Sequence, residues 1–159
     1  MKVWLAPKGL HIEPGSVGDS GALARLHGEG FHTGWPSSEF AAFLADPDRT
    51  PAYVACDKNR RIAGFALFRI TDGEAELLTI AVGRRHRGAG IGRALMDAAL
   101  SDMMMRAVET VFLEVDEANQ AAGKLYSRLG FEQVGRRENY YSLADGSRAS
   151  ALVMRYGLG

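Results

Sequence analysis

Cysteine is nearly absent from this sequence, because Cys56 is the only one among its 159 residues. A single thiol excludes a disulfide within the chain and is typical of proteins in reducing compartments. The four histidines show none of the short spacings by which zinc motifs are recognised. The sequence therefore predicts neither a disulfide nor a metal site.

Long apolar runs and net charge are missing as well. No stretch approaches the roughly 18 consecutive apolar residues of a membrane span, and the first residues, MKVWLAPKGLHIEPG, lack the apolar core and cleavage site of a signal peptide. Lys and Arg together number 19, as do Asp and Glu, and this balance argues against direct nucleic-acid binding. We therefore expect a cytoplasmic protein that binds no membrane.

The composition predicts a single folded domain. Hydrophobic residues make up 47% of the chain and charged residues 24%, which is typical of globular proteins. A chain of 159 residues is also long enough to bury a core of its own. We expect one domain over residues 1–159, present as a monomer or a weak dimer.

What the sequence does contain is a glycine- and arginine-rich turn between an apolar strand and an amphipathic helix, within residues 77–99. Gly88, Gly90 and Gly92 leave the backbone without Cβ atoms at alternate positions, so successive N–H groups can close around an anion. The helix that begins at about Gly92 directs the positive end of its dipole at the same place. The arginines of this segment are Arg84, Arg85, Arg87 and Arg93. The turn therefore predicts a diphosphate site.

Spacing distinguishes among the phosphate ligands that such turns bind. A P-loop requires GxxxxGK[ST], and no Lys-Ser or Lys-Thr follows these glycines. A dinucleotide fingerprint, GxGxxG, usually lies early in a βαβ unit, whereas this chain has GxGxG about ninety residues from its start. The pattern that fits is RxxGxG, formed by Arg87, Gly90 and Gly92. The residues alone leave open that the glycines serve only turn geometry.

A second informative segment is residues 111–131, VFLEVDEANQAAGKLYSRLGF. Its first part alternates with period two, which predicts a strand that turns Glu114 away from its apolar neighbours. Asn119 is a candidate N-cap for the helix that follows, and Gly130 is the candidate stop. Asn119 and Tyr126 are two helical turns apart, so they share one face of that helix.

The order of elements along the chain predicts a mixed α/β sheet. The expected helices are residues 20–30, 38–45, a helix from about 92, and 119–129. The expected strands are residues 52–56, 61–70, 76–82, 111–115, 131–137 and 149–155.

These segments resemble the GNAT superfamily of N-acetyltransferases, whose acetyl-CoA signature is RxxGxG. The sequence LEV, an asparagine five residues after its glutamate, LYxxLGF, RRxNYY at residues 136–141 and a final ALVM are similar to the RimI type, which acetylates the N-terminal alanine of a ribosomal protein. This resemblance covers about residues 60–156.

The resemblance implies an α/β (α+β) GNAT fold: a mixed, mostly antiparallel central sheet flanked by about four helices. It also implies a splay between the strands that contain Glu76 and Val111, where the pantetheine arm of acetyl-CoA inserts. Acetyl-CoA is the implied co-substrate, and no metal is implied. The matching cofactor-binding positions are Ile80, Ala81, Val82, Arg87, Gly88, Ala89, Gly90, Ile91, Gly92, Arg93 and Asn119.

The resemblance makes Glu114 the proton acceptor and Tyr126 the proton donor. An amine attacks a thioester only when it is neutral, so a base must remove a proton before or during attack. Glu76 is a second candidate base, acting through water. The plainer alternatives are that Glu114 is a solvated residue on an exposed strand face and that Tyr126 only packs in the core.

On the acceptor side, the resemblance suggests that Phe31 and Trp35, in the loop after the first helix, contact the substrate. Both are large apolar residues, and an anchor for that loop is the alternative. Tyr140 and Tyr141, in the last hairpin, are the other candidate substrate-binding residues.

The expected function is transfer of acetyl from acetyl-CoA to a protein N-terminal α-amine, with the N-terminal alanine of a ribosomal protein as the expected acceptor. Two alternatives remain. One is a small-molecule amine N-acetyltransferase of the same fold, because function is set by the site and not by the fold. The other is a non-catalytic acyl-CoA-binding regulatory module.

Overall fold

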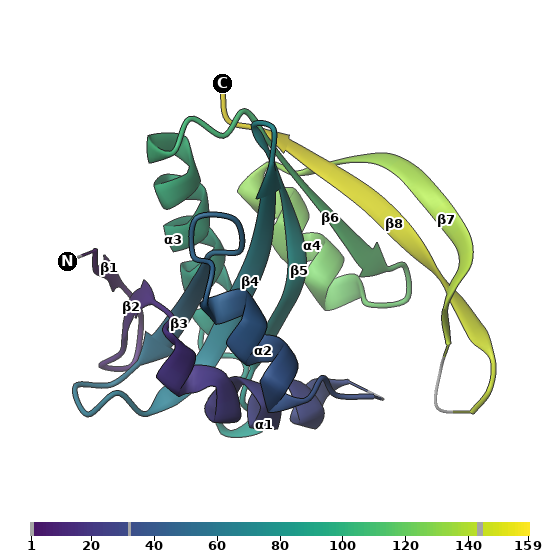
Figure 1. Cartoon of the computed structure of the whole chain (residues 1–159). Coiled ribbons are helices and arrows are strands. Elements are labelled where there is room, and N and C mark those ends of the chain that lie inside the picture. Colours follow the sequence, from purple (N-terminus) through teal and green to yellow (C-terminus); the bar gives the residue numbers. More distant parts are fainter. Residues whose placement is uncertain (1, 32, 143–144) are drawn as a thin grey trace.

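The computed structural model describes residues 2–31, 33–142 and 145–159, without the side chains of residues 140–142. In these ranges, eight strands form one sheet in the order β1-β2-β3-β4-β5-β6-β8-β7 (Figure 1). The strands are β1 (Trp4–Leu5), β2 (His11–Pro14), β3 (Ala52–Cys56), β4 (Ile62–Thr71), β5 (Glu74–Val82), β6 (Thr110–Asp116), β7 (Glu132–Ser142) and β8 (Arg148–Gly157). The helices are α1 (Ser20–Gly30), α2 (Ser37–Leu44), α3 (Ile91–Met105) and α4 (Gln120–Leu129), with short 3-10 turns η1 (Val17–Asp19) and η2 (Arg84–His86).

The sheet is mixed and mostly antiparallel, as the resemblance implied. Among the described strands, β5 and β6 form a parallel pair, and the other neighbouring strands pair antiparallel. The expected fold class is therefore confirmed.

Two parts of the sequence prediction were incomplete. The short strands β1 and β2 were missed because they are too brief to show an alternating pattern, and β2 ends in Pro14, which belongs at a sheet edge. The last hairpin is longer than expected, since β7 runs to Ser142 and not to residue 137. Its register shifts between Arg137 and Tyr141, and a polar, irregular strand of this kind lacks a clear period-two signal.

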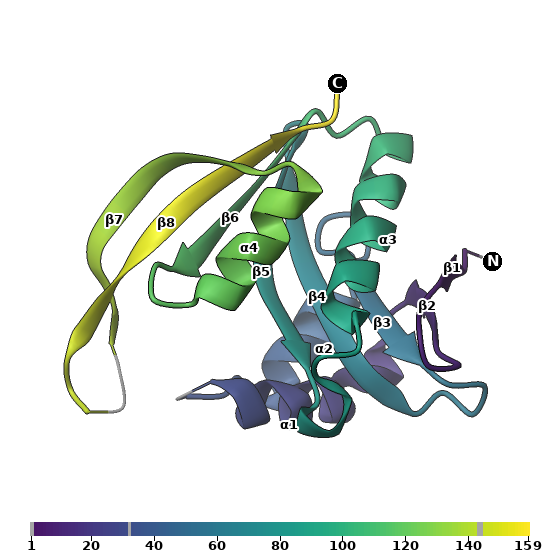
Figure 2. The ribbon, with the colours of Figure 1, turned by 180° about the vertical axis from the view of Figure 1, so that it is seen from behind.

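Helices cover both faces of the sheet and give it two cores (Figures 1 and 2). Helices α3 and α4 lie over one face, where the larger core includes Leu95, Met96, Leu113 and Phe131. Helices α1 and α2 lie over the other face, where a smaller core forms around Phe40. No helix in the described ranges combines the length and apolar composition that a membrane crossing needs.

Candidate active site

Strands β5 and β6 are paired over only part of their lengths. Their ladder consists of Glu74 with Thr110, Ala75 with Val111, and Glu76 with Phe112. Beyond these pairs β5 continues to Val82 and β6 to Asp116, and the two ribbons diverge (Figure 2). The expected splay is therefore present.

The edge of β5 that faces the splay can pair with an extended ligand. Backbone N–H and C=O groups need partners, and an extended chain can supply them in the manner of an added strand. Ile80, Ala81 and Val82, which the family resemblance assigned to cofactor binding, lie on this part of β5.

Strand β5 contains a β-bulge just after the end of its ladder with β6. The register with β4 passes from Leu67 opposite Thr79 to Phe68 opposite Leu77, so Leu78 is the extra residue. Bulges bend a strand and commonly occur next to active sites. This one lies at the end of the paired segment.

The turn after β5 has the backbone shape that the sequence predicted. Gly88 and Gly90 adopt φ angles of 76° and 84°, in the left-handed region that favours glycine, and Gly90 is the N-cap of α3. The first N–H groups of α3 therefore face the turn without helical partners. Gly92 lies inside α3, where an added Cβ would lie 3.7 Å from Leu125 Cδ2, an ordinary contact.

Three of the four arginines around this turn have partners within the protein. Arg87 Nε donates to the carbonyl of Val82 at 3.1 Å, which ties the turn to the end of β5. The guanidinium of Arg84 binds the carbonyl of Glu29 in α1. Arg93 and Asp97 form an exposed pair one helical turn apart, at 3.2 Å. Because most of these arginines are already paired, the candidate diphosphate site consists mainly of the backbone N–H groups of the turn.

Substituting Gly90 tests this site. In Gly90→Ala, a left-handed φ costs about 1–2 kcal/mol for a residue with a Cβ, so the N–H groups at the start of α3 should lose their arrangement. We expect KM for acetyl-CoA to rise about tenfold with a smaller change in kcat, measured by initial rates. Gly21→Ala, at an open position in α1, is the matched control. Equal KM values for the two variants would contradict the assignment.

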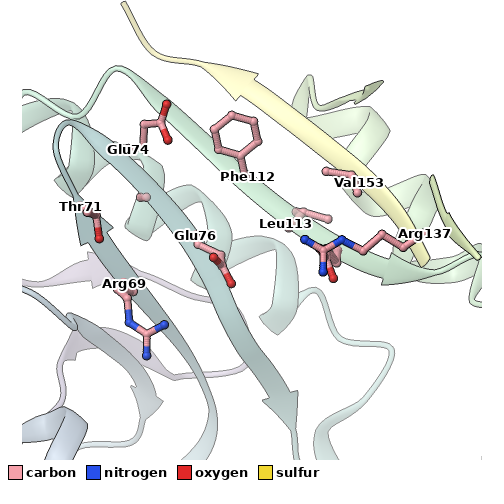
Figure 3. A pocket seen from close by; sticks show the side chains of 10 residues that line it. Arg69, Thr71, Glu74, Glu76, Phe112, Leu113, Arg137 and Val153 are labelled. Carbon is pink, nitrogen blue, oxygen red and sulfur yellow. The ribbon is translucent and has the colours of Figure 1, made fainter. Parts of the chain in front are cut away.

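A polar pocket lies on the face of the sheet that carries α1 and α2, beside the splay (Figure 3). Glu76, Phe112 and Glu114 point to this face because they alternate with residues of the larger core. Its lining residues are Arg69, Thr71, Glu74, Ala75, Glu76, Phe112, Leu113, Glu114, Arg137 and Val153. Three carboxylates against two guanidinium groups give the pocket an acidic excess, which favours a cationic amine.

Glu114 is neither fully buried nor simply solvated. Its side chain is 24% exposed, and its Oε1 lies 3.0 Å from Nε of Arg137 in β7. A carboxylate has two oxygens with several acceptor positions, so one guanidinium leaves capacity for a second donor. Glu76 lines the same pocket from β5. Its register partner in β6 is Phe112, and Glu114 lies two residues further along β6. The structure thus brings both candidate bases together.

Tyr126 lies on the opposite side of the sheet from Glu114. It is 5% exposed, and its ring packs edge-on against Phe131 with centroids 5.9 Å apart. The core packing that the sequence left open is therefore present, and a proton-donor role is compatible with it. The helix that holds Tyr126 begins and ends as predicted, since Asn119 Oδ1 accepts from the Ala122 N–H at 3.2 Å and Gly130 adopts a φ of 108°.

The loop after α1 is held by an aromatic stack around His27. The His27 ring stacks on Phe31 at 4.1 Å and on Trp35 at 4.6 Å, and its Nδ1 accepts the Trp35 N–H at 3.1 Å. Burial lowers the pKa of His27, so Nδ1 remains an acceptor at neutral pH. Trp35 also packs near Phe40, so it anchors the loop.

The contacts with substrate that the sequence assigned to this loop and to the hairpin stay predictions. Phe31 is 43% exposed, and neither Phe31 nor Trp35 lines the polar pocket. Tyr140 and Tyr141 belong to β7, with the Tyr141 backbone opposite Ala149, and their side chains lie outside the described part of the chain.

Sequence reasoning missed three residues near the splay. Arg69 and Arg137 line the polar pocket, and no pattern marks an arginine as a pocket residue before the strand order is known. Thr79 is 6% exposed, and its Oγ1 has no hydrogen-bond partner among the described residues. It shares a sheet face with Leu67, its register partner, which belongs to the core beneath α1 and α2. An unsatisfied buried hydroxyl at this place is a candidate ligand contact.

The sequence of this chain matches a known family of acetyltransferases, in agreement with the fold. Residues 21–131, more than half of the chain, match the sequence profile of the Acetyltransferase (GNAT) family. The chain therefore belongs to this family of acetyltransferases.

Two relatives of this chain are named as N-acetyltransferases. The chain is 39% identical over 97 residues to the [ribosomal protein bS18]-alanine N-acetyltransferase of Escherichia coli K12, a match that covers 61% of this chain and 65% of that protein. It is 38% identical over 125 residues to the N-alpha-acetyltransferase RimI of Mycobacterium tuberculosis, over 76% of this chain and 74% of the relative. The chain thus spans slightly less than two thirds of the E. coli sequence in that match.

Solved structures extend the match to nearly the whole chain. The crystal structure of the ribosomal-protein-S18-alanine N-acetyltransferase from E. coli superposes with a TM-score of 0.86 at 29% identity, over 94% of both chains. NAA60 of Arabidopsis thaliana in complex with acetyl-CoA shares the fold at a TM-score of 0.80 and 21% identity, over 93% of this chain and 98% of that one. The resemblance to the RimI type is therefore confirmed.

Proposed function

We propose that this chain transfers the acetyl group of acetyl-CoA to a protein N-terminal α-amine, with the N-terminal alanine of a ribosomal protein as the preferred acceptor. The observation that carries the proposal is the position of Glu114, in an acidic pocket beside the point where β5 and β6 part. The relatives from E. coli and M. tuberculosis, which are named as N-acetyltransferases of bS18 alanine and of α-amines, support the choice of acceptor.

The chain's part in binding acetyl-CoA follows from the turn and the splay. The N–H groups from Gly88 to Arg93 bind the diphosphate, with the α3 dipole behind them. The free edge of β5 at residues 80–82 pairs with the pantetheine arm. Asn119, at the start of α4, adds a polar contact. The thioester then lies at the bulge of β5, between the polar pocket and Tyr126.

In the chemical step, Glu114 accepts a proton from the α-ammonium group, directly or through a water molecule. The neutral nitrogen forms a bond to the thioester carbonyl carbon, and the bond from that carbon to sulfur breaks with its electron pair on sulfur. Tyr126 Oη donates a proton or a hydrogen bond to this sulfur. No covalent acetyl-enzyme is needed, because the amine attacks acetyl-CoA directly.

An α-amine suits a carboxylate base better than a lysine side chain does. The pKa of an α-amino group is roughly 7.7–8.0, whereas that of lysine is about 10.4. Near neutral pH the α-amine is partly neutral already, while only about one lysine in a thousand is. A modest base is therefore sufficient for N-terminal acetylation.

The proposed acceptor is tested with hexapeptides whose α-amine is either free or blocked. Each peptide begins with alanine and contains one lysine, and mass spectrometry locates the acetyl group. We expect acetylation of the free α-amine and none of the blocked peptide. Acetylation of lysine alone, or of small amines alone, would contradict the proposed acceptor, and binding of acetyl-CoA without turnover of any amine would favour a regulatory module.

A further inference from the structure

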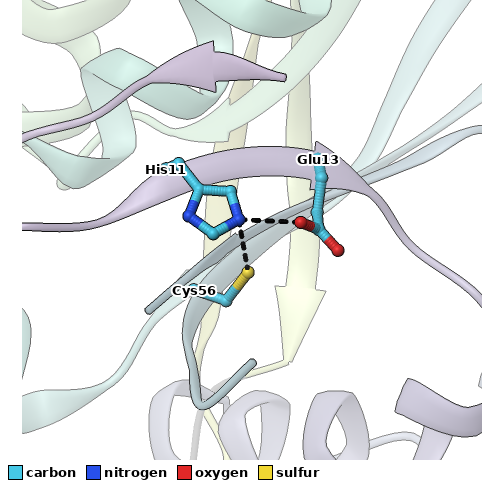
Figure 4. Close-up of side chains that lie close together, drawn as sticks. All are labelled: His11, Glu13 and Cys56. Carbon is cyan, nitrogen blue, oxygen red and sulfur yellow. Dashed lines mark hydrogen bonds and ion pairs between the residues drawn. The ribbon is translucent and has the colours of Figure 1, made fainter. Parts of the chain in front are cut away.

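Away from the polar pocket, three side chains that can bind a metal converge on one point: His11, Glu13 and Cys56. His11 in β2 lies directly opposite Cys56 in β3, and Glu13 follows two residues later on the same face of β2 (Figure 4). His11 Nε2 lies 2.7 Å from Glu13 Oε2 and 3.6 Å from Cys56 Sγ. The three ligand atoms all lie within 4.8 Å of one another.

The two contacts of His11 use the same ring nitrogen. In a nucleophilic triad the carboxylate binds one imidazole nitrogen and the nucleophile binds the other, so this arrangement is not a triad. A single proton on Nε2 forms a near-linear hydrogen bond to the carboxylate or to the sulfur, and not to both. A cation at the centre of the three atoms would satisfy them together.

We propose that His11 Nε2, Glu13 Oε2 and the Cys56 thiolate bind one thiophilic divalent cation of the Zn²⁺ type. Zinc bonds of about 2.3 Å to sulfur and about 2.0–2.1 Å to nitrogen, at a tetrahedral angle, place sulfur and nitrogen about 3.5 Å apart. The observed separation of 3.6 Å matches this value. Zinc bonds to nitrogen and to a carboxylate oxygen at a tetrahedral angle place those two atoms about 3.4 Å apart, so the Glu13 oxygen needs to withdraw from Nε2 by about 0.7 Å, which rotation of its side chain allows.

The charges around the cluster balance once a divalent ion is bound. The thiol of Cys56 releases its proton to solvent on binding, so one thiolate and one carboxylate neutralise the two charges of the ion. Arg60 contacts the other oxygen of Glu13 and is itself paired with Asp19 at 2.7 Å. The Arg60 guanidinium therefore holds the Glu13 carboxylate in place through the oxygen that does not bind the ion. Metal-binding carboxylates commonly have such a hydrogen-bond partner.

Exposure of the cluster provides an entry path and a fourth coordination position. The side chains of His11 and Glu13 are 29% and 17% exposed, while Cys56 is fully buried. A water molecule can therefore complete the tetrahedron from the solvent side. The ion would link β2 to β3, strands that contribute no residue to the polar pocket. It would thus stabilise the sheet edge and take no part in acetyl transfer.

The spacing of His11 and Cys56 explains why sequence motifs do not reveal this cluster. The two residues are 45 positions apart in the chain, whereas zinc motifs are recognised by ligands separated by a few residues. The antiparallel pairing of β2 with β3 brings them together.

Titration of the metal-free full chain with Co²⁺ tests the proposal. Because Cys56 is the only thiol, a thiolate-to-Co²⁺ charge-transfer band in the near ultraviolet would report this residue alone. We expect that band at one equivalent of Co²⁺, together with the intense visible bands of a tetrahedral complex, and their loss on addition of Zn²⁺. Absence of the charge-transfer band, with or without Co²⁺ binding, would overturn the proposal.

Variants identify the other two ligands. His11→Asn and Glu13→Gln should each raise the Kd for Co²⁺ at least about tenfold, and Glu132→Gln, at an exposed position in β7, should leave it unchanged. Cys56→Ser should abolish the charge-transfer band. If that buried variant fails to fold, the variants at the partly exposed His11 and Glu13 still test the proposal. A Kd that is the same in His11→Asn, Glu13→Gln and the unaltered chain would overturn the assignment.

Discussion

Replacing Glu114 by glutamine lowers kcat by about 10²–10⁴-fold if this carboxylate is the base, because a positioned general base contributes that factor. Glutamine keeps the size of the side chain but cannot accept the proton of the α-ammonium group. KM for acetyl-CoA should change little, since the candidate diphosphate site lies on a different part of the chain. Steady-state rates with an alanine-initiated hexapeptide measure both quantities.

Two neighbouring glutamates provide the controls for this prediction. Glu74 lines the same pocket at the paired end of β5, so Glu74→Gln should change kcat by less than about threefold. Glu76→Gln decides between the candidate bases. A large loss of kcat in Glu76→Gln with near-normal kcat in Glu114→Gln would move the role of base to Glu76.

The largest expected effect on stability is at Asp102, a carboxylate in the core. Its side chain is 2% exposed and accepts hydrogen bonds from Lys2 at 2.5 Å, Tyr53 at 2.6 Å and Arg106 at 2.9 Å. Tyr53 is itself 1% exposed, so its hydroxyl depends on this partner. Removing one partner of a buried ionic network costs about 3–5 kcal/mol. Chemical denaturation of Asp102→Ala should show a loss of that order.

Asp97→Ala, also in α3, is the matched control for the core variant. Asp97 is 56% exposed and forms an exposed pair with Arg93, so its removal should cost no more than about 0.5 kcal/mol. Equal losses for the two variants would show that the Asp102 network contributes little.

The contribution of Asp102 depends on pH with a defined sign. Burial alone would raise the pKa of Asp102, but the hydrogen bonds from Lys2, Tyr53 and Arg106 outweigh burial and lower the pKa below its usual value of 3.8. The charged carboxylate therefore stabilises the fold above the unfolded-state pKa, and this contribution is lost as pH falls through the lower folded-state pKa. The difference in stability between the unaltered chain and Asp102→Ala should narrow in that acidic range.

Local patterns were sufficient to predict most of the fold. The period-two alternation around Glu114, the N-cap at Asn119 and the stop at Gly130 all lie where the sequence placed them, because each depends on residues close in the chain. The left-handed glycines of the turn were likewise readable, since few other residues adopt that conformation. The splay was expected from the family resemblance alone.

The parts that could not be predicted depend on contacts between distant segments. The Glu114–Arg137 pair joins β6 to β7, and the opposition of His11 and Cys56 follows from the pairing of β2 with β3. The unpartnered hydroxyl of Thr79 is a property of its burial, which no local pattern encodes. Such features become visible only when the strand order and register are known.

The roles proposed for Glu114 and Tyr126 require that backbone N–H groups from Gly88 to Arg93 bind the diphosphate of coenzyme A. Calorimetric titration of the chain and of Gly90→Ala with CoA and with pantetheine, which lacks the diphosphate together with the 3′-phosphoadenosine, tests this, because the diphosphate contribution is the part of the CoA preference that Gly90→Ala loses. Two charge-assisted hydrogen bonds at about 1.5 kcal/mol each predict that CoA binds about a hundredfold more tightly than pantetheine. Equal affinity for the two molecules, an unchanged preference in Gly90→Ala, or no binding of CoA, would contradict the account.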